Sequence, residues 1–438
     1  MKMFFSNLAL HTLVYSRRQY LSLFTVCVTG IAIMLSAVWI TDGMLAAVED
    51  KARIYYGGDF VLMVGLTERD DFGRQKKDIE NPSEKMQAIK ALVPEDARTA
   101  YRIEYDAKDT LIFFEGMSIR QRMFKGVDFK SERPLLEGLN FIEGGVPEDS
   151  MDGYECIIIS QPAAQQLGVR AGDCVTVQAK TETGYTNTNE MYVSGVFVDT
   201  SLFGMYTAYL DIKSLRKLID VSDDFVNRIC VCYPSGELSR KEVLSIQEGL
   251  SSRFNMYHLT DSKTEFNRYA RRQIERTYAL ITLDANIKDL QILIDALKAV
   301  VLLIIVILVT IISVGMGSTY RISVMKRITE IATYRAIGMK PSGVRKVFLV
   351  EAFYLLAAGF AAAVLVSLVL TNVLSLFNFS FIPAFDIFLV NSHLCSKIRI
   401  FKSLGLFLII GVTTILSMLF TIRNVVHISP VSALATTT

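Results

Sequence analysis

Residues 299–320 read AVVLLIIVILVTIISVGMGSTY, a stretch without a single charged side chain. Three other windows are also uncharged: residues 21–41, 352–373 and 403–422. A helix rises about 1.5 Å per residue, so each window is long enough to cross the roughly 30 Å hydrocarbon core of a bilayer. Runs of 18 or more apolar residues are rare in soluble core helices. The sequence therefore predicts four transmembrane helices.

The composition of the whole chain conceals this division. It has 438 residues, with 46 Lys+Arg against 44 Asp+Glu and 51% hydrophobic residues, which excludes a disordered chain and a nucleic-acid binder. Outside the four windows the charge density is that of an ordinary soluble protein. The first window is longer than the apolar stretch of about 7–15 residues in a cleavable signal peptide, and we expect it to be retained.

Basic residues near the windows predict the topology, because Lys and Arg are retained on the cytoplasmic side. Three precede the first window: Lys2, Arg17 and Arg18. Seven lie between the second and third windows: Arg321, Lys326, Arg327, Arg335, Lys340, Arg345 and Lys346. Three others oppose the rule before the fourth window: Lys397, Arg399 and Lys402. The parity of four spans still places that last loop outside, so both termini are predicted to be cytoplasmic.

The long segment between the first two windows is predicted to be an extracytoplasmic α+β domain on a helical stalk. Neither glycine nor proline occurs in residues 250–314, which predicts one continuous helix from near Ser262 into the second span. The first helix should continue to Tyr56 and stop at Gly57 and Gly58. The predicted strands are residues 60–64, 110–114, 119–124, 155–159, 173–179, 190–198, 206–210 and 227–233. The predicted helices are residues 82–92, 161–167, 212–219 and 240–254.

Proline and glycine cluster in residues 133–153, where an internal boundary is plausible. The six cysteines do not indicate a disulfide framework, since five lie on the outer side without a regular spacing. Cys230 and Cys232 would point to the same face of a strand, which favours a packing role.

The loop between the second and third spans carries the most informative motif. Residues 327–337 have the composition of an amphipathic helix, Gly338 supplies a stop, and residues 340–343 (KPSG) form a turn. Ser342 is then expected to cap the helix that enters the membrane. Such a short helix could dock onto a soluble partner or bind anionic lipid headgroups at the interface. The residues alone leave both alternatives open.

Four segments carry a resemblance to a known family. Residues 330–339 read EIATYRAIGM and are followed by FLVE at 348–351, and the chain ends with SPVSAL at 429–434. Together they resemble the signature of FtsX-type permeases, the membrane subunits of mechanotransmission ABC transporters such as MacB, LolC/LolE and FtsX. Residues 156–173 and 192–196 are similar to the MacB-type periplasmic core domain.

The resemblance implies a division of labour in the bacterial inner membrane. The chain lacks a Gly-x-x-x-x-Gly-Lys-Ser/Thr phosphate loop, so ATP and magnesium are expected in a separate cytoplasmic ABC ATPase. The family's coupling helix corresponds to residues 330–339. Its predicted contacts are Glu330, Arg335, Ala336, Gly338 and Met339. The resemblance also implies a second permease copy or a paralogue, with a periplasmic adaptor or a lipoprotein carrier as further candidate partners.

The residues give little support to an enzyme. The four histidines are scattered on both sides of the membrane, and the spans contain no ionisable side chain for an ion relay. Gly315 and Gly317 in the second span and Gly359 in the third predict close helix packing. We expect no catalytic residue and no metal site in this chain.

These inferences divide the chain into nine segments. They are a cytoplasmic segment (1–20), the first span (21–41), the outer stalk and domain (42–298), the second span (299–320), the cytoplasmic coupling loop (321–351), the third span (352–373), an outer loop (374–402), the fourth span (403–422) and a cytoplasmic tail (423–438). The expected function is a permease that transmits ATP-driven motion for lipoprotein release or efflux. The alternatives are an FtsX-like regulator of cell-wall hydrolases and a stalk-borne receptor or scaffold.

Overall fold

The computed structural model describes residues 17–65, 78–148, 155–199, 201, 203–233, 239–273, 275–379, 381–382 and 385–425. Lys2 and the motif at residues 429–434 lie outside these ranges. The chain forms two compact units. The membrane unit comprises Met1–Leu45, Ile294–Asn378 and Leu394–Thr438. The α+β unit comprises Ala46–Leu293 and Phe379–His393.

Within the described residues, four helices are long and apolar enough to span a membrane. They are α2 (Arg17–Tyr56), α10 (Lys288–Lys326), α12 (Pro341–Ser375) and α13 (Ile400–Val425). Each predicted window lies inside one of these helices, and the prediction of four membrane helices is confirmed. As predicted, α2 continues to Tyr56 and ends before Gly57, which adopts a φ of 93°.

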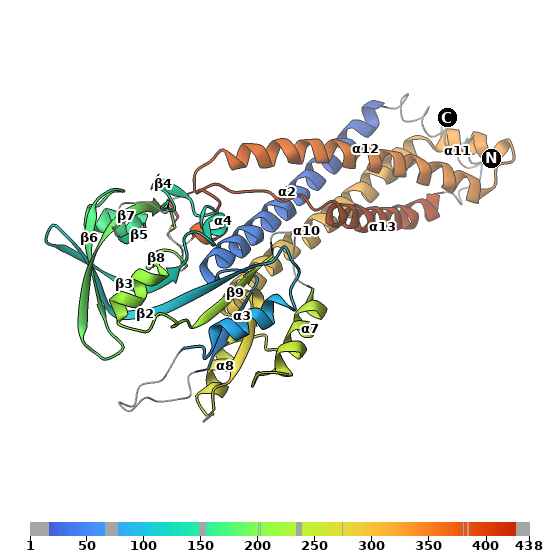
Figure 1. Ribbon diagram of the computed structural model, residues 1–438. Helices are drawn as coiled ribbons and strands as arrows, with labels where there is room; N and C mark the ends of the chain where they lie inside the picture. The colour runs from blue at the N-terminus through green and yellow to red at the C-terminus, as the bar shows by residue number, and fades with distance from the viewer. Residues whose placement is uncertain are drawn as a thin grey trace. The chain divides into compact units, whose positions relative to one another are not determined.

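The helices of the membrane unit are drawn as ribbons in Figure 1. Polar side chains join them across their interfaces. The Trp39 indole of α2 donates to the Ser403 hydroxyl of α13 at 2.9 Å. The Ser367 hydroxyl of α12 donates to the Ala32 carbonyl of α2 at 3.0 Å, and Ser417 of α13 bonds the Ser313 carbonyl of α10 at 2.9 Å. Hydrogen bonds of this kind hold membrane helices together where no hydrophobic driving force acts between them.

The described strands of the α+β unit form one sheet of ten. Their bounds are β1 (Phe60–Val64), β2 (Arg98–Phe114), β3 (Met117–Val127), β4 (Phe141–Gly144), β5 (Glu155–Ser160), β6 (Cys174–Lys180), β7 (Thr186–Phe197), β8 (Thr207–Asp211), β9 (Arg228–Cys232) and β10 (Tyr278–Thr282). The order is β10-β1-β9-β2-β3-β8-β5-β7-β4, and β6 pairs with both β2 and β7. The pairings from β2 through β3, β8, β5, β7 and β6 therefore return to β2 and close a ring.

The sheet has two parts, the ring and the three strands β10, β1 and β9, and the long strand β2 belongs to both. Its first half pairs with β9, from Arg98 to Arg102, and its second half pairs with β6, from Leu111 to Phe113. The register against β3 shifts between Asp106 and Thr110, where the strand passes from one part to the other. A shift of this kind bends a strand and increases its twist.

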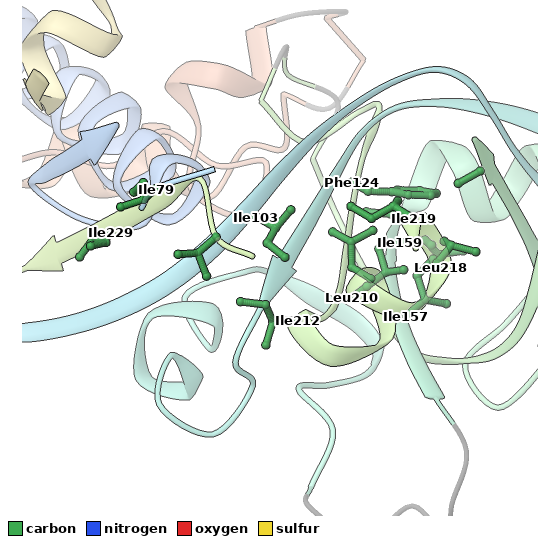
Figure 2. Close-up of a cluster of buried hydrophobic side chains, with 14 of the residues drawn as sticks. Ile79, Ile103, Phe124, Ile157, Ile159, Leu210, Ile212, Leu218, Ile219 and Ile229 are labelled. Atoms are coloured by element: carbon green, nitrogen blue, oxygen red, sulfur yellow. The ribbon is translucent and has the colours of Figure 1, made fainter. Parts of the chain in front are cut away.

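Buried side chains from both parts of the sheet form one continuous hydrophobic core. Figure 2 shows Ile79 and Ile229 at one end of this core, and Phe124, Ile157 and Leu210 at the other. The helices of this unit are α3 (Pro82–Lys90), α4 (Arg133–Leu136), α5 (Gln161–Leu167), α6 (Ile212–Ile219), α7 (Arg240–Ser251), α8 (Lys263–Ala270) and α9 (Leu283–Asn286). Of these, α3, α5, α6 and α7 bury side chains in this core. The predicted α+β fold class is confirmed, and α5 and α6 have the predicted bounds.

The prediction of one helix from Ser262 into the second span is wrong. The chain there forms α8, then β10, then α9, and α10 begins only at Lys288. Strand β10 pairs antiparallel with β1 over its full length, from Thr282 to Tyr278. Tyr278, Leu280 and Ile281 bury their side chains in this sheet, and that burial outweighs the helical preference of a segment without glycine or proline.

Two smaller predictions are also corrected. The boundary predicted in residues 133–153 is absent from its described part, residues 133–148, since Leu136 of α4 packs with Ile158 of the sheet and β4 pairs with β7 of the same sheet. Residues 149–153 lie outside the described ranges. Ser342 does not cap α12, because that helix begins at Pro341 with Lys340 in the capping position. Proline is favoured in the first helical turn, where its missing N–H costs no hydrogen bond. The six cysteines are all free, and Cys230 is buried, as its predicted packing role requires.

Candidate functional site: the α11 loop and the end of α2

The loop between α10 and α12 contains a short helix, α11 (Ile328–Ala336). It ends as the sequence predicts, because Gly338 adopts a φ of 94°, which favours glycine over every other residue. Ile331 and Ala332 bury one face of α11 in the core of the membrane unit. The opposite face and the turn after the helix are left at the surface.

The structure places the predicted coupling residues at different depths. Glu330, Ala336 and Gly338 are exposed, whereas Arg335 and Met339 are half-buried. A Cβ added at Gly338 would meet no atom within 4 Å. The five residues therefore do not form one exposed patch, and Met339 packs against the core of the membrane unit.

Ile337 is a surface residue that the sequence analysis did not single out. Its side chain is 80% exposed, although it lies between Ala336 and Gly338 in an apolar stretch. A single exposed isoleucine is not unusual in itself. Here the isoleucine side chain projects from an exposed turn beside Gly338, and no described residue covers it. This geometry suits a protein partner that approaches the turn closely.

A buried ion pair fixes the base of α11. Arg327 is 4% exposed and lies 3.0 Å from the Glu351 carboxylate of α12, which is fully buried. The Tyr20 hydroxyl of α2 donates to the same carboxylate at 3.0 Å, so three helical segments meet at one charge. Arg327 also pairs with the exposed Glu330 at 2.8 Å. The partners of a buried charge must be present together, and this network therefore holds α11 in one orientation.

A second ion pair marks the opposite end of the membrane unit. Lys402 of α13 lies 2.5 Å from Asp42 of α2, and the Lys397 amide donates to the Trp39 carbonyl at 3.0 Å. Tyr20 and Asp42 are about 33 Å apart along α2, given a rise of about 1.5 Å per residue. One of the three basic residues that oppose the positive-inside rule is thus neutralised by a carboxylate.

The glycines predicted for helix packing have different surroundings. A Cβ at Gly359 of α12 would lie 3.1 Å from the Cys27 sulfur of α2, so this glycine permits a close approach. A Cβ at Gly315 would meet no atom of the chain within 4 Å, and Gly317 is buried. Gly30 of α2 is a close-packing position that the sequence analysis missed, because a Cβ there would lie 2.8 Å from Ile312 of α10.

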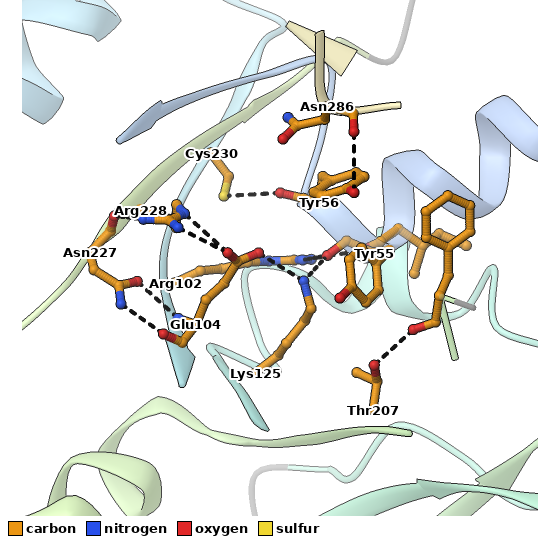
Figure 3. A network of polar contacts seen from close by, with 12 residues as sticks. Tyr55, Tyr56, Arg102, Glu104, Lys125, Thr207, Asn227, Arg228, Cys230 and Asn286 are labelled. Atoms are coloured by element: carbon orange, nitrogen blue, oxygen red, sulfur yellow. Dashed lines mark hydrogen bonds and ion pairs between the residues drawn. The ribbon is translucent and has the colours of Figure 1, made fainter. Parts of the chain in front are cut away.

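A second cluster of charges surrounds the end of α2 in the α+β unit (Figure 3). Arg102 of β2 is 1% exposed and donates to the Ile54 and Tyr55 carbonyls at 3.0 and 3.1 Å. Its guanidinium pairs with the buried Glu132 at 2.5 Å. The last carbonyls of a helix have no partner within the helix, and cations near them also oppose the negative end of the helix dipole.

Lys125 of β3 completes this cap. Its ammonium donates to the Tyr55 carbonyl at 2.5 Å and lies 2.9 Å from Glu104, which also pairs with Arg228 at 3.1 Å. Burial lowers the pKa of Lys125 to about 8, although Glu104 opposes this shift. Burial alone would raise the pKa of Glu104, but Lys125, Lys263 and Arg228 hold it well below its ordinary value. The cluster therefore keeps a charged network at the end of α2.

The charges around Tyr55 were not predicted from the sequence. Arg102, Glu104, Lys125 and Glu132 lie in strands and loops where charged residues are usually solvated. No local pattern in the sequence marks them as buried, because β2 carries several other charged residues and Glu132 lies in a loop. The structure brings them together on the last turn of α2, which is thereby tied to two strands of the sheet.

Comparisons with known proteins agree with the sequence analysis on the membrane part of the chain. Residues 301–430 match the family "FtsX-like permease C-terminal". Curated proteins give no match to the chain. Among solved structures, the periplasmic region of MacB from Actinobacillus actinomycetemcomitans aligns at 11% identity and a TM-score of 0.33, covering 55% of this chain and 95% of that one. The part of the chain from residue 301 to residue 430 is therefore similar to the C-terminal region of FtsX-like permeases, the family that its sequence motifs resemble.

Proposed function

We propose that the chain is the permease subunit of an ABC transporter that conveys the motion of a separate cytoplasmic ATPase to the α+β unit. The observation that carries this proposal is the construction of α2. It is an unbroken helix of 40 residues whose first part packs in the core of the membrane unit. Its last turn is held by the buried cations Arg102 and Lys125. A helix tied at both ends is suited to conveying displacement along its axis.

The α11 loop is the proposed docking surface for the ATPase. Glu330, Ile337 and Gly338 are exposed there, and the Arg327–Glu351 pair holds the helix from behind. A rigid base would pass a push on α11 to α2 through Tyr20, which bonds the same carboxylate. Because seven basic residues lie between α10 and α12, the positive-inside rule favours a cytoplasmic location for this loop. The chain would then lie in the inner membrane of a bacterium, with its α+β unit on the extracytoplasmic side.

Three tasks fit such a permease. Lipoprotein release and efflux of a substrate are the first two, with a lipoprotein carrier or a periplasmic adaptor as the respective partner. A non-transporting regulator of cell-wall hydrolases is the third, and its smaller mechanical task makes the large α+β unit harder to explain. A pair of permeases, either two copies or this chain with a paralogue, would give the ATPase dimer two docking surfaces. ATP and magnesium would bind the ATPase alone.

We expect the tagged chain, purified in mild detergent from its native host, to bring an ABC ATPase with it. The Glu330→Ala/Arg335→Ala variant should recover at least fivefold less ATPase, because it removes two polar contacts of the proposed surface. Ile337→Asp should reduce recovery at least as much, since it replaces this exposed apolar side chain with a charge. Quantitative mass spectrometry of the purified complexes measures the ratio of ATPase to permease.

Arg399→Ala is the matched control, because Arg399 lies in the loop before α13 and should have no role in this docking. Its ATPase recovery should equal that of the unmodified chain. If no ABC ATPase accompanies the unmodified chain in repeated purifications, the receptor or scaffold alternative gains. Equal recovery by all variants would instead show that the ATPase docks elsewhere.

A further inference from the structure

A cavity of about 430 Å³ lies within the α+β unit, beside the last turns of α2. Its volume falls within the range of about 300–1,000 Å³ that is typical of small-molecule sites. Most of its lining is apolar and includes Ile54, Leu135, Leu139, Phe203 and Leu389. The proposed docking of an ATPase at the α11 loop does not account for this cavity.

The cations around the cavity are already neutralised or exposed. Lys51 lies 3.0 Å from the Asp386 carboxylate and donates to the Asp386 carbonyl at 2.6 Å. Arg53 pairs with Asp59 at 2.8 Å. Arg98, the third basic residue of the lining, is exposed. Both paired cations, Lys51 and Arg53, are half-buried, and an anionic ligand would have to compete with their carboxylate partners.

Two buried carboxylates of the lining, Asp199 and Glu132, could each accept a further cation or hydrogen-bond donor. Asp199 is 6% exposed and accepts hydrogen bonds from Ser201, from its amide at 2.8 Å and from its side chain, but it has no ion pair with any residue that the structure describes. Glu132 offers one oxygen to Arg102, while its other oxygen, Oε1, has no hydrogen-bond partner among the described residues. Burial raises the pKa of Asp199, against the opposing effect of Lys51. An isolated carboxylate in an apolar cavity is unfavourable unless a cation accompanies it.

The aromatic residues of the lining also favour a positively charged ligand. Tyr209 and Tyr233 both border the cavity. The face of an aromatic ring carries negative charge and attracts ammonium groups within about 6 Å. Apolar walls, tyrosine rings and a buried carboxylate without a counter-ion are the combination that binds organic ammonium compounds.

We propose that this cavity binds an organic cation with an apolar body, and that Asp199 is the counter-ion of its ammonium group. The apolar body would fill the space between Ile54, Leu139 and Phe203. The α2 wall begins at Ala47, about 9 Å along the helix from Thr41, where the uncharged window ends. Amphiphilic amines that concentrate at a membrane surface belong to this class.

Three probes with one apolar body test the proposal. They are 4-phenylbutylamine, 4-phenylbutanol and 4-phenylbutyric acid, which are cationic, neutral and anionic at pH 7. Binding to the full chain in lipid nanodiscs is measured by isothermal titration calorimetry, with empty nanodiscs subtracted. The amine should bind at least tenfold more tightly than the alcohol or the acid. Equal affinities for all three would overturn the assignment of a cation, and preferred binding of the acid would reverse it.

The Asp199→Asn variant locates the amine. Asparagine keeps an oxygen that can accept the Ser201 amide but carries no charge, so affinity for the amine should fall at least tenfold while affinity for the alcohol stays constant. Asp173→Asn is the control, because Asp173 accepts the Arg170 amide outside the cavity. Unchanged amine affinity in Asp199→Asn would refute the role of Asp199.

A second variant protects the test against misfolding. Leu139 is half-buried in the lining, and Leu139→Trp should fill the cavity and remove binding of the amine and the alcohol together. Retained binding in this variant would place the ligand elsewhere. None of these measurements involves the ATPase, so their failure and the failure of the proposed function are distinguishable.

Discussion

Replacing Arg102 with methionine should lower the free energy of unfolding of the α+β unit by about 3–5 kcal/mol, the usual cost of removing one partner from a buried ion pair. The substitution leaves Glu132 buried without a counter-ion and leaves the Ile54 and Tyr55 carbonyls without their donor. Each unsatisfied buried group adds to the cost. Hydrogen exchange of peptides from β1, β2 and β9, followed under conditions of global opening, measures the loss.

The double variant Arg102→Met/Glu132→Leu separates the ion pair from the helix cap. It removes both charges, so most of the loss that comes from the unpaired carboxylate should be recovered. The destabilisation that remains in the double variant measures the loss of the hydrogen bonds from Arg102 to the Ile54 and Tyr55 carbonyls. If the double variant were no more stable than Arg102→Met, the buried carboxylate would not be the main cause, and the energetic role assigned to the pair would be wrong.

Glu351→Leu should destabilise the membrane unit by about 3 kcal/mol or more, because it leaves Arg327 buried beside Tyr20 without the carboxylate that both contact. Trp39 is the single tryptophan of the chain and is buried in the same unit. Its fluorescence therefore reports unfolding of this unit in a denaturant titration in detergent.

Glu330→Ala provides the comparison for this prediction. Glu330 contacts the same guanidinium at 2.8 Å, but its side chain is exposed, so its removal should cost less than about 1 kcal/mol. A loss in Glu330→Ala as large as that in Glu351→Leu would contradict the view that burial gives the Arg327–Glu351 pair its importance.

The membrane helices could be predicted because their signal is local. A window without charge, such as residues 299–320, can satisfy its backbone in lipid only as a helix, whatever surrounds it. The end of α11 was predictable for a similar reason, since Gly338 takes up a positive φ at little cost. Strands with β-branched residues between turn residues, such as β1 and β5, carried their own signal as well.

The remaining features depend on partners that are distant in the sequence. Strand β10 exists because β1 lies beside it, and Tyr278–Thr282 alone resembles the continuation of a helix. Arg327 and Glu351 look like ordinary surface charges of a cytoplasmic loop until the helices bring them together. Arg102 and Lys125 likewise meet the end of α2 only through the sheet. The sequence thus located the α11 loop but not the contacts that hold it.

If α2 conveys ATP-driven motion to the α+β unit, a proline that breaks α2 should interrupt this transmission. Asp50 is exposed, so Asp50→Pro breaks the helix without removing a buried side chain, while Asp50→Ala keeps the helix intact. The chain with its ATPase in nanodiscs is compared with and without ATP by hydrogen exchange of β1 and β9. We expect an ATP-dependent difference in the unmodified chain and in Asp50→Ala that disappears in Asp50→Pro, although ATP hydrolysis continues. An undiminished difference in Asp50→Pro would contradict transmission through α2.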